Sequence, residues 1–148
     1  EYLKVVHHRE QGSPPFLSLE TEKALHAFIL NVIREGVVQS AHDCSDGGLS
    51  VALSECCVSA QDARRGAVVR LPLDTLRRDA LLFGESQSRV VLSVKPEIAD
   101  QVLNRAWDSG IPAMKIGTVG GDRFVIDLEG QEIRDRGQMS PPSMRAIA

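Results

Sequence analysis

The sequence has few cysteines, no excess of basic residues and no long apolar run, and each of these absences excludes a class of protein. Its three cysteines, of which Cys56 and Cys57 are adjacent, have neither the spacing of a disulfide framework nor that of a zinc site. The cysteines therefore favour a reducing, cytoplasmic setting. The formal net charge of −3 disfavours a nucleic-acid partner. No apolar run is long enough to span a membrane and no signal peptide is recognisable, so we expect no membrane partner.

The short motifs of the common nucleotide-binding and hydrolytic sites are missing as well. The sequence contains no GxxxxGK[ST] loop, no GxGxxG turn, no GxSxG elbow and no HExxH helix. Its length of 148 residues fits one domain. Because the chain begins at Glu1 and not at a methionine, we expect a domain excised from a longer protein.

Segments with helical and strand patterns alternate along the chain. We expect helices at residues 18–35, 47–59, 74–83 and 96–109, and strands at residues 37–42, 67–71, 90–94, 113–118 and 123–128. Gly120-Gly121-Asp122 predicts that the last two strands form a hairpin. The pattern dissolves from Gln131, which predicts a domain at 1–130 and an irregular tail at 131–148. Together these elements predict an α+β fold with helices packed on a mixed sheet.

The helical spacing also predicts which side chains form the core. We expect the core to include Leu25, Phe28, Ile29, Leu49, Leu53, Val91, Val102 and Leu103.

The first candidate site is the polar turn His42-Asp43-Cys44-Ser45-Asp46-Gly47-Gly48-Leu49, between a predicted strand and a predicted helix. Asp43, Ser45 and Asp46 are residue types that cap helices. Gly47 and Gly48 allow a sharp turn or the close approach of a ligand. A strand, a glycine turn and a helix N-terminus together make a natural anion site. An ordinary capped helix would produce the same pattern, and the turn alone does not decide between the two.

The second candidate site is the turn from Gly84 to Arg89, just before a strand. Carboxylates and hydroxyls suit a Mg²⁺–phosphate ligand. Ser86 and Gln87 can hydrogen-bond ribose or phosphate. The alternative is that Glu85 and Arg89 merely pair with each other. If the two strands are antiparallel neighbours, both turns lie at one sheet edge, and we expect Asp43 and Glu85 to face solvent there.

Three stretches carry a resemblance to a known family. Residues 42–49 resemble the HDxSDGGL turn in the C-terminal domain of the aminoimidazole ribonucleotide synthetase-like superfamily. A second resemblance is to a segment of the phosphoribosylformylglycinamidine synthase family, in the small form of its synthetase subunit. It is carried by the stretch Leu82-Phe83-Gly84-Glu85-Ser86-Gln87-Ser88-Arg89-Val90. Ile116-Gly117-Thr118-Val119-Gly120-Gly121-Asp122 resembles a second segment of that family. The resemblance covers residues 1–128.

The resemblance implies a three-layer α/β/α domain and a ligase of purine biosynthesis. The family converts formylglycinamide ribonucleotide to formylglycinamidine ribonucleotide with ATP, Mg²⁺ and glutamine-derived ammonia. It implies Mg²⁺ binding at Asp43, substrate or nucleotide binding at the second turn and the two glycines, and no catalytic residue on this chain; the binding residues are Glu85, Ser86, Gln87, Gly47 and Gly48. The implied partners are other domains of the same chain, a glutaminase subunit and a small accessory subunit.

A second reading remains open within the same family. The resemblance implies a protein built of two related halves, in which this chain matches the last domain of the second half and takes its site roles by analogy with the first. The second half could instead be a non-catalytic module for assembly or for holding a structural nucleotide. In both readings we expect the isolated domain to fold and to be inactive, because the remaining domains of the cleft are missing.

Overall fold

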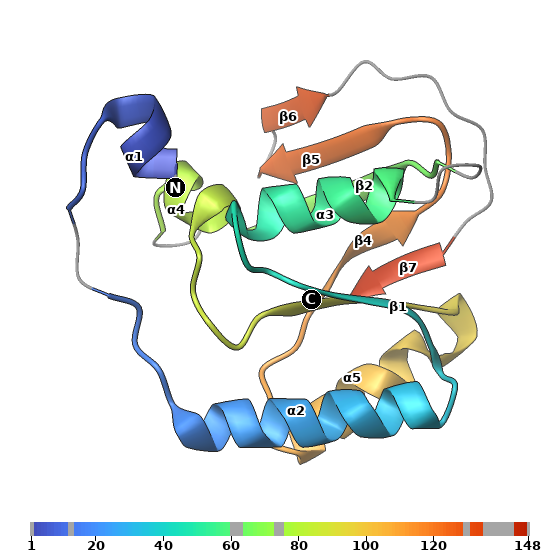
Figure 1. Cartoon of the computed structure of the whole chain (residues 1–148). Helices are drawn as coiled ribbons and strands as arrows, with labels where there is room; N and C mark the ends of the chain where they lie inside the picture. The colour runs from blue at the N-terminus through green and yellow to red at the C-terminus, as the bar shows by residue number, and fades with distance from the viewer. Residues whose placement is uncertain are drawn as a thin grey trace.

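A computed structural model describes residues 2–11, 14–59, 64–72, 76–128, 131–134 and 144–147 (Figure 1). Its helices are α1 (Tyr2–His7), α2 (Leu19–Arg34), α3 (Gly48–Val58), α4 (Arg78–Phe83), the 3₁₀ turn η1 (Pro96–Ile98) and α5 (Ala99–Asp108). Its strands are β1 (Val38–Asp43), β2 (Ala67–Leu71), β3 (Val90–Val94), β4 (Lys115–Val119), β5 (Phe124–Leu128), β6 (Gln131–Arg134) and β7 (Met144–Ile147). All five predicted strands are present, and no helix in these described ranges is long and apolar enough to cross a membrane.

The seven strands form one sheet in the order β1-β3-β7-β4-β2-β5-β6. Strands β2 and β5 are parallel, and every other neighbouring pair is antiparallel. The predicted mixed sheet is therefore confirmed.

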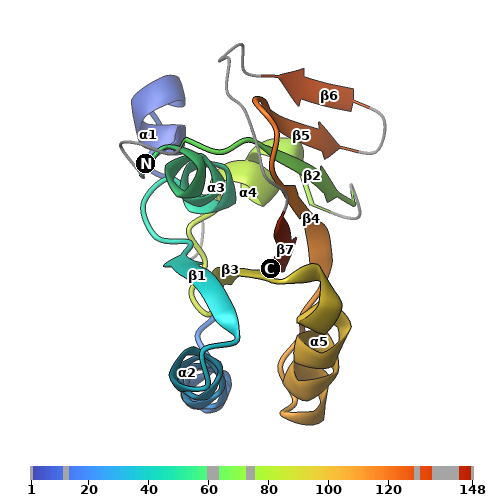
Figure 2. The same cartoon turned by 90° about the vertical axis from the view of Figure 1, so that its right-hand side faces the viewer.

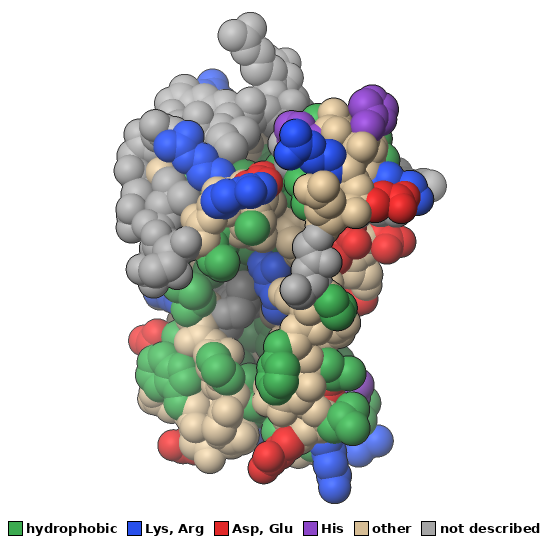
Figure 3. All heavy atoms as spheres, turned by 90° about the vertical axis from the view of Figure 1, so that its left-hand side faces the viewer, with side chains coloured by type: hydrophobic (Ala, Val, Ile, Leu, Met, Phe, Trp, Pro, Cys, Tyr) green, Lys and Arg blue, Asp and Glu red, His purple; other side chains and the backbone are tan. Residues whose placement is uncertain are grey.

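Helices cover both faces of β3, which confirms the expected α/β/α layering there. Val91 belongs to a buried cluster with Leu49 of α3, whereas Leu92 belongs to a second cluster with Phe28 of α2 and Val102 of α5. Successive strand residues point to opposite faces, so the two clusters lie on opposite sides of the strand. Figure 2 shows α3 and α4 on one side of β1 and β3, and α2 and α5 on the other. Figure 3 shows a hollow in one face of the molecule, between the side that carries α3 and α4 and the side that carries α2 and α5.

The predicted core is confirmed, with one residue at its margin. Ile29 is partly buried, and the other predicted core residues are buried: Leu25, Phe28, Leu49, Leu53, Val91, Val102 and Leu103. Helix α2 begins where its sequence predicts, because the Ser18 side chain accepts a hydrogen bond from the Thr21 N–H at 3.2 Å.

The predicted hairpin is wrong. Strands β4 and β5 do not pair with each other, because β2 lies between them. The loop that joins β4 to β5 hydrogen-bonds instead to Gly66, the residue before β2: the Gly120 N–H donates to the Gly66 carbonyl at 2.7 Å, and the Gly66 N–H donates to the Gly121 carbonyl at 3.0 Å. These glycines therefore hydrogen-bond to the residue that leads into β2, and they do not form the two-residue turn of a hairpin.

The stretch expected to be an irregular tail contains two strands. Strand β6 pairs with β5, and β7 lies between β3 and β4. Strand β7 takes its hydrogen bonds from neighbours that are distant in sequence, so a local pattern does not reveal it. Residues 135–143 and 148 lie outside the described residues. A domain boundary near residue 130 stays a prediction.

Candidate functional site

The two polar turns lie at the same edge of the sheet, as predicted. Strands β1 and β3 are antiparallel neighbours, and Asp43 at the end of β1 is paired with Val90 at the start of β3. One residue beyond this pair, the Cys44 N–H donates to the Arg89 carbonyl at 2.9 Å. The end of one strand thus brings the first turn beside the second.

A polar cavity of about 440 Å³ lies between the turns. The first turn contributes Asp43, Ser45 and Asp46, and the second contributes Glu85, Ser86 and Gln87. Helix α2 adds Glu22 and His26, which the sequence analysis missed because no local signal connects α2 to either turn. Five of the six candidate site residues therefore line or border one space: Asp43, Glu85, Ser86, Gln87 and, through its contact with Glu85, Gly47.

Asp43 faces solvent, as expected. Its side chain is 71% exposed. The Ser45 hydroxyl donates a hydrogen bond to the Asp43 carboxylate, and this bond lowers the pKa of the Asp43 carboxyl. The beginning of the first turn thus presents an ionised carboxylate, which is a suitable ligand for a cation.

The start of α3 differs from the prediction. The N-cap residue is Gly47, and α3 has no hydrogen bond from a capping side chain of its own turn. Instead the Gly47 N–H donates to Glu85 Oε1 at 3.0 Å, across a separation of 38 residues. This bond lowers the pKa of Glu85. Glu85 is half-buried instead of facing solvent freely.

The amides of both turn glycines are engaged within the chain. The Gly48 N–H donates to the Ser45 carbonyl at 3.1 Å, while the Gly47 N–H is held by Glu85. A carboxylate of the protein therefore lies at the N-terminus of α3, where the helix dipole favours negative charge, and ligand binding at the two glycines stays a prediction.

Gly48 also lets the two turns touch. Its φ of +70° lies in the left-handed region, and a Cβ added there would be 2.7 Å from the Gly84 carbonyl oxygen and 2.8 Å from the Phe83 carbonyl carbon. Only glycine allows the first turn to lie this close to the backbone of the second.

The second turn is held from two further directions. The Ser88 hydroxyl donates to Glu22 Oε1 of α2 at 2.5 Å, and Ser88 itself has a φ of +63°. Arg89 Nη1 donates to the Gly84 carbonyl at 3.1 Å, which closes the turn on itself. The contacts thus direct Glu85 toward the first turn and Arg89 toward its own turn. The alternative given in the sequence analysis was that these two side chains pair with each other.

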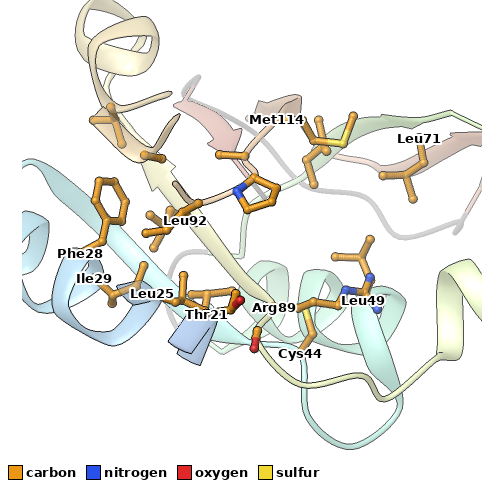
Figure 4. Close-up of a pocket in the computed structure, with 18 of the residues that line it drawn as sticks. Thr21, Leu25, Phe28, Ile29, Cys44, Leu49, Leu71, Arg89, Leu92 and Met114 are labelled. Carbon is orange, nitrogen blue, oxygen red and sulfur yellow. The ribbon is translucent and has the colours of Figure 1, made fainter. Parts of the chain in front are cut away.

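A second, apolar cavity of about 340 Å³ adjoins the polar one. Figure 4 shows Phe28 and Ile29 of α2 at one end of it and Cys44 and Leu49 at the other. The two cavities share lining residues Leu25, Cys44, Ser88, Arg89 and Val90. The sequence analysis missed this cavity, because its walls come from both helical layers.

Within the described part of the chain, no group of three His, Cys, Asp or Glu side chains is arranged to hold a metal ion. A cation at Asp43 would therefore take its other ligands from phosphate oxygens and water, which is how Mg²⁺ commonly binds.

Comparison with known proteins identifies the family. The sequence profile of the family described as "AIR synthase related protein, C-terminal domain" matches residues 1–129. The chain belongs to this family. The resemblance carried by the motifs is thereby confirmed, and both polar turns lie within the matched residues.

Curated relatives of this family domain are considerably longer than the chain. The phosphoribosylformylglycinamidine synthase subunit PurL of Moorella thermoacetica is 47% identical over 133 residues, which cover 90% of this chain and 18% of the relative. The same subunit of Anaeromyxobacter sp. (strain Fw109-5) is 45% identical over 133 residues, covering 85% of this chain and 17% of the relative. The chain spans less than a fifth of the length of these relatives.

Solved structures of the same kind of protein have this fold. Thermotoga maritima PurL complexed with ATP matches with a TM-score of 0.66 and 25% identity, over 76% of this chain and 20% of that one. The same protein complexed with FGAR matches with a TM-score of 0.65 and 25% identity, over the same shares. These matches confirm the α+β fold class.

Proposed function

We propose that this chain is the C-terminal-type domain of an ATP-dependent amidoligase of de novo purine biosynthesis. The reaction converts formylglycinamide ribonucleotide to formylglycinamidine ribonucleotide with ammonia derived from glutamine. The observation that carries the proposal is the 47% identity to a phosphoribosylformylglycinamidine synthase subunit over 90% of the chain. The solved relatives described as complexed with ATP and with FGAR support the two classes of ligand.

The polar cavity is the part of the ligand cleft that this domain supplies. Ser86 and Gln87 line it and offer hydroxyl and amide groups to the polar atoms of a nucleotide or of the substrate. Glu85 and the backbone of Gly47 and Gly48 form the adjoining wall.

Asp43 is the residue that we assign to Mg²⁺. Its carboxylate is exposed and its pKa is lowered, so it is ionised at neutral pH and accessible to a cation. One protein carboxylate, with phosphate oxygens and water, is a suitable ligand set for Mg²⁺. When bound, Mg²⁺ would neutralise phosphate charge in the cleft.

Other parts of the longer protein complete the site. The exposure of Asp43 and Gln87 supports a cleft that closes against other domains of the same synthetase chain. A glutaminase subunit would supply ammonia, a small accessory subunit would join the assembly, and the setting would be the cytoplasm. ATP would activate the formyl amide oxygen that ammonia displaces, and we assign no catalytic residue to this chain.

Substitution of Gln87 in the longer protein tests the proposal. Gln87→Ala should weaken the binding of ATP–Mg²⁺ or of formylglycinamide ribonucleotide, measured by calorimetry, and should lower amidine formation. Glu97→Ala, at an exposed position on η1 beyond the other end of β3, is the matched control. Loss of nucleotide binding with unchanged turnover would instead favour the alternative, a non-catalytic module that holds a structural nucleotide. Unchanged binding of both ligands and unchanged turnover would contradict both readings.

A further inference from the structure

Glu85 is a residue of the second turn whose side chain hydrogen-bonds to the start of α3. Its Oε1 accepts the Gly47 N–H at 3.0 Å, and Gly47 is the N-cap of an 11-residue helix that has no capping side chain of its own turn. A carboxylate at this position satisfies an amide that the helix leaves open and interacts favourably with the positive end of the helix dipole. The local sequence of a helix normally supplies this group, and here a residue 38 positions away supplies it.

A second hydrogen bond also joins the two turns. It runs from the Cys44 N–H to the Arg89 carbonyl at 2.9 Å, on the strand side of the cavity. Next to the bond of Gly47, Gly48 lies directly against the backbone of Gly84. The two bonds and this close approach hold the turns at a set separation, and the cavity lies where they face each other.

The neighbouring residues of the second turn are placed differently. Ser86 is half-buried and Gln87 is exposed, and both line the polar cavity. Glu85 precedes them directly, so anchoring its carboxylate to α3 also sets the start of the Ser86–Gln87 segment. At the far end of that segment, Ser88 is held by Glu22 at 2.5 Å.

We propose that Glu85 is a positioning residue, which acts by accepting the Gly47 N–H and thereby orienting Ser86 and Gln87 toward the ligand. The proposal rests on the function proposed above and assigns Glu85 a different role from direct ligand contact. Ligand contacts then fall to Asp43 on one turn and to Ser86 and Gln87 on the other.

Two substitutions separate positioning from direct contact. Glu85→Gln keeps the length of the side chain and an amide oxygen that accepts the Gly47 N–H, but it removes the charge. Glu85→Asp keeps the charge but is one methylene shorter, so its carboxylate does not reach Gly47. A positioning role predicts that the glutamine variant resembles the wild type and the aspartate variant does not. A direct role of the charge predicts the reverse.

The first measurement needs no ligand. In the 148-residue chain, amide hydrogen exchange at Gly47 should accelerate about tenfold in Glu85→Asp and stay near the wild-type rate in Glu85→Gln. The backbone resonances of Ser86 and Gln87 should move further from their wild-type positions in the aspartate variant than in the glutamine variant. Glu97→Asp is the control. Unchanged Gly47 exchange and unchanged Ser86 and Gln87 resonances in Glu85→Asp would overturn the positioning role.

The second measurement uses ATP–Mg²⁺ with the longer protein. Glu85→Asp should weaken binding by about 10- to 100-fold, the usual effect of losing a residue that orients a ligand-binding group, and Glu85→Gln should bind within a few-fold of the wild type. The reverse order of the two variants would show that Glu85 contacts the ligand through its charge and would overturn the proposal. Failure of the unsubstituted protein to bind ATP–Mg²⁺ would count against the proposed function, while the exchange measurement would still decide the positioning role.

Discussion

Ser88 donates a hydrogen bond to Glu22 at 2.5 Å, across 66 positions of sequence, and so joins the second turn to α2. Ser88 has a φ of +63°, a conformation that costs a residue with a Cβ about 1–2 kcal/mol. Glu22 in turn lies 3.1 Å from His26 Nε2 on the next turn of the same helix. The fold thus holds Ser88 in an unfavourable backbone conformation at the edge of the cavity.

Two substitutions of Ser88 separate its hydrogen bond from its backbone conformation. Ser88→Ala and Ser88→Gly both remove the bond to Glu22, but only glycine adopts positive φ without a steric cost. We expect the glycine variant to be about 1 kcal/mol more stable than the alanine variant. Urea denaturation of both variants measures the difference, and equal stability would contradict the strain at this position.

Gly48→Ala should destabilise the chain more than Gly36→Ala does. Both glycines have a φ of +70°, but an added Cβ at Gly36 meets nothing within 4 Å, whereas at Gly48 it would be 2.7 Å from the Gly84 carbonyl oxygen. The clash should add about 1–3 kcal/mol to the backbone cost that the two variants share. The free energy of unfolding of each variant tests this; equal losses would show that the turns do not touch at Gly48.

Phe28→Ala should cost about 3–5 kcal/mol of unfolding free energy, because its side chain is only 8% exposed and packs between α2 and the sheet. Phe16→Ala is the matched control, since Phe16 is 91% exposed and its loss should change stability by less than about 0.5 kcal/mol. A denaturation midpoint that Phe28→Ala leaves in place would contradict the buried face of α2.

The stability of the chain should depend on pH partly through Glu85. The bond from the Gly47 N–H lowers the pKa of this carboxyl in the folded state. Its stabilising contribution is therefore fully present above the unfolded-state value of about 4.5 and is lost as the pH falls through the lower folded-state value. Glu85→Gln should lose less stability on acidification than the wild type. Denaturation at several pH values between neutrality and pH 3 measures this, and identical profiles would refute it.

The isolated chain should show no amidine formation. It supplies one side of the proposed cleft, and Asp43 and Gln87 are exposed. An assay with ATP, Mg²⁺, formylglycinamide ribonucleotide and ammonium should therefore give no turnover above background. Turnover by this chain alone would mean that it contains a complete active site.

The sequence by itself determined the elements whose causes are local. Helix α2 follows from the Ser18 cap and the spacing of its apolar residues, and β3 follows from the apolar run that begins at Val90. The continuous apolar run also predicted that β3 is covered on both faces. The structure confirms this, since both faces of the strand are packed. The motifs of the two turns, together with residues 116–122, were sufficient to indicate the family, since a motif is a property of neighbouring residues.

Only the tertiary structure decided the contacts that join distant segments. The pairing of Gly66 with Gly120 and Gly121 placed β2 between two strands that a local turn signal had paired with each other. The cap of α3 came from Glu85 and not from Asp43, Ser45 or Asp46, because the antiparallel pairing of β1 with β3 brings the second turn within hydrogen-bonding distance of Gly47. An amide takes whichever acceptor the packed chain brings near it, and neighbouring residues in sequence do not specify which one that is.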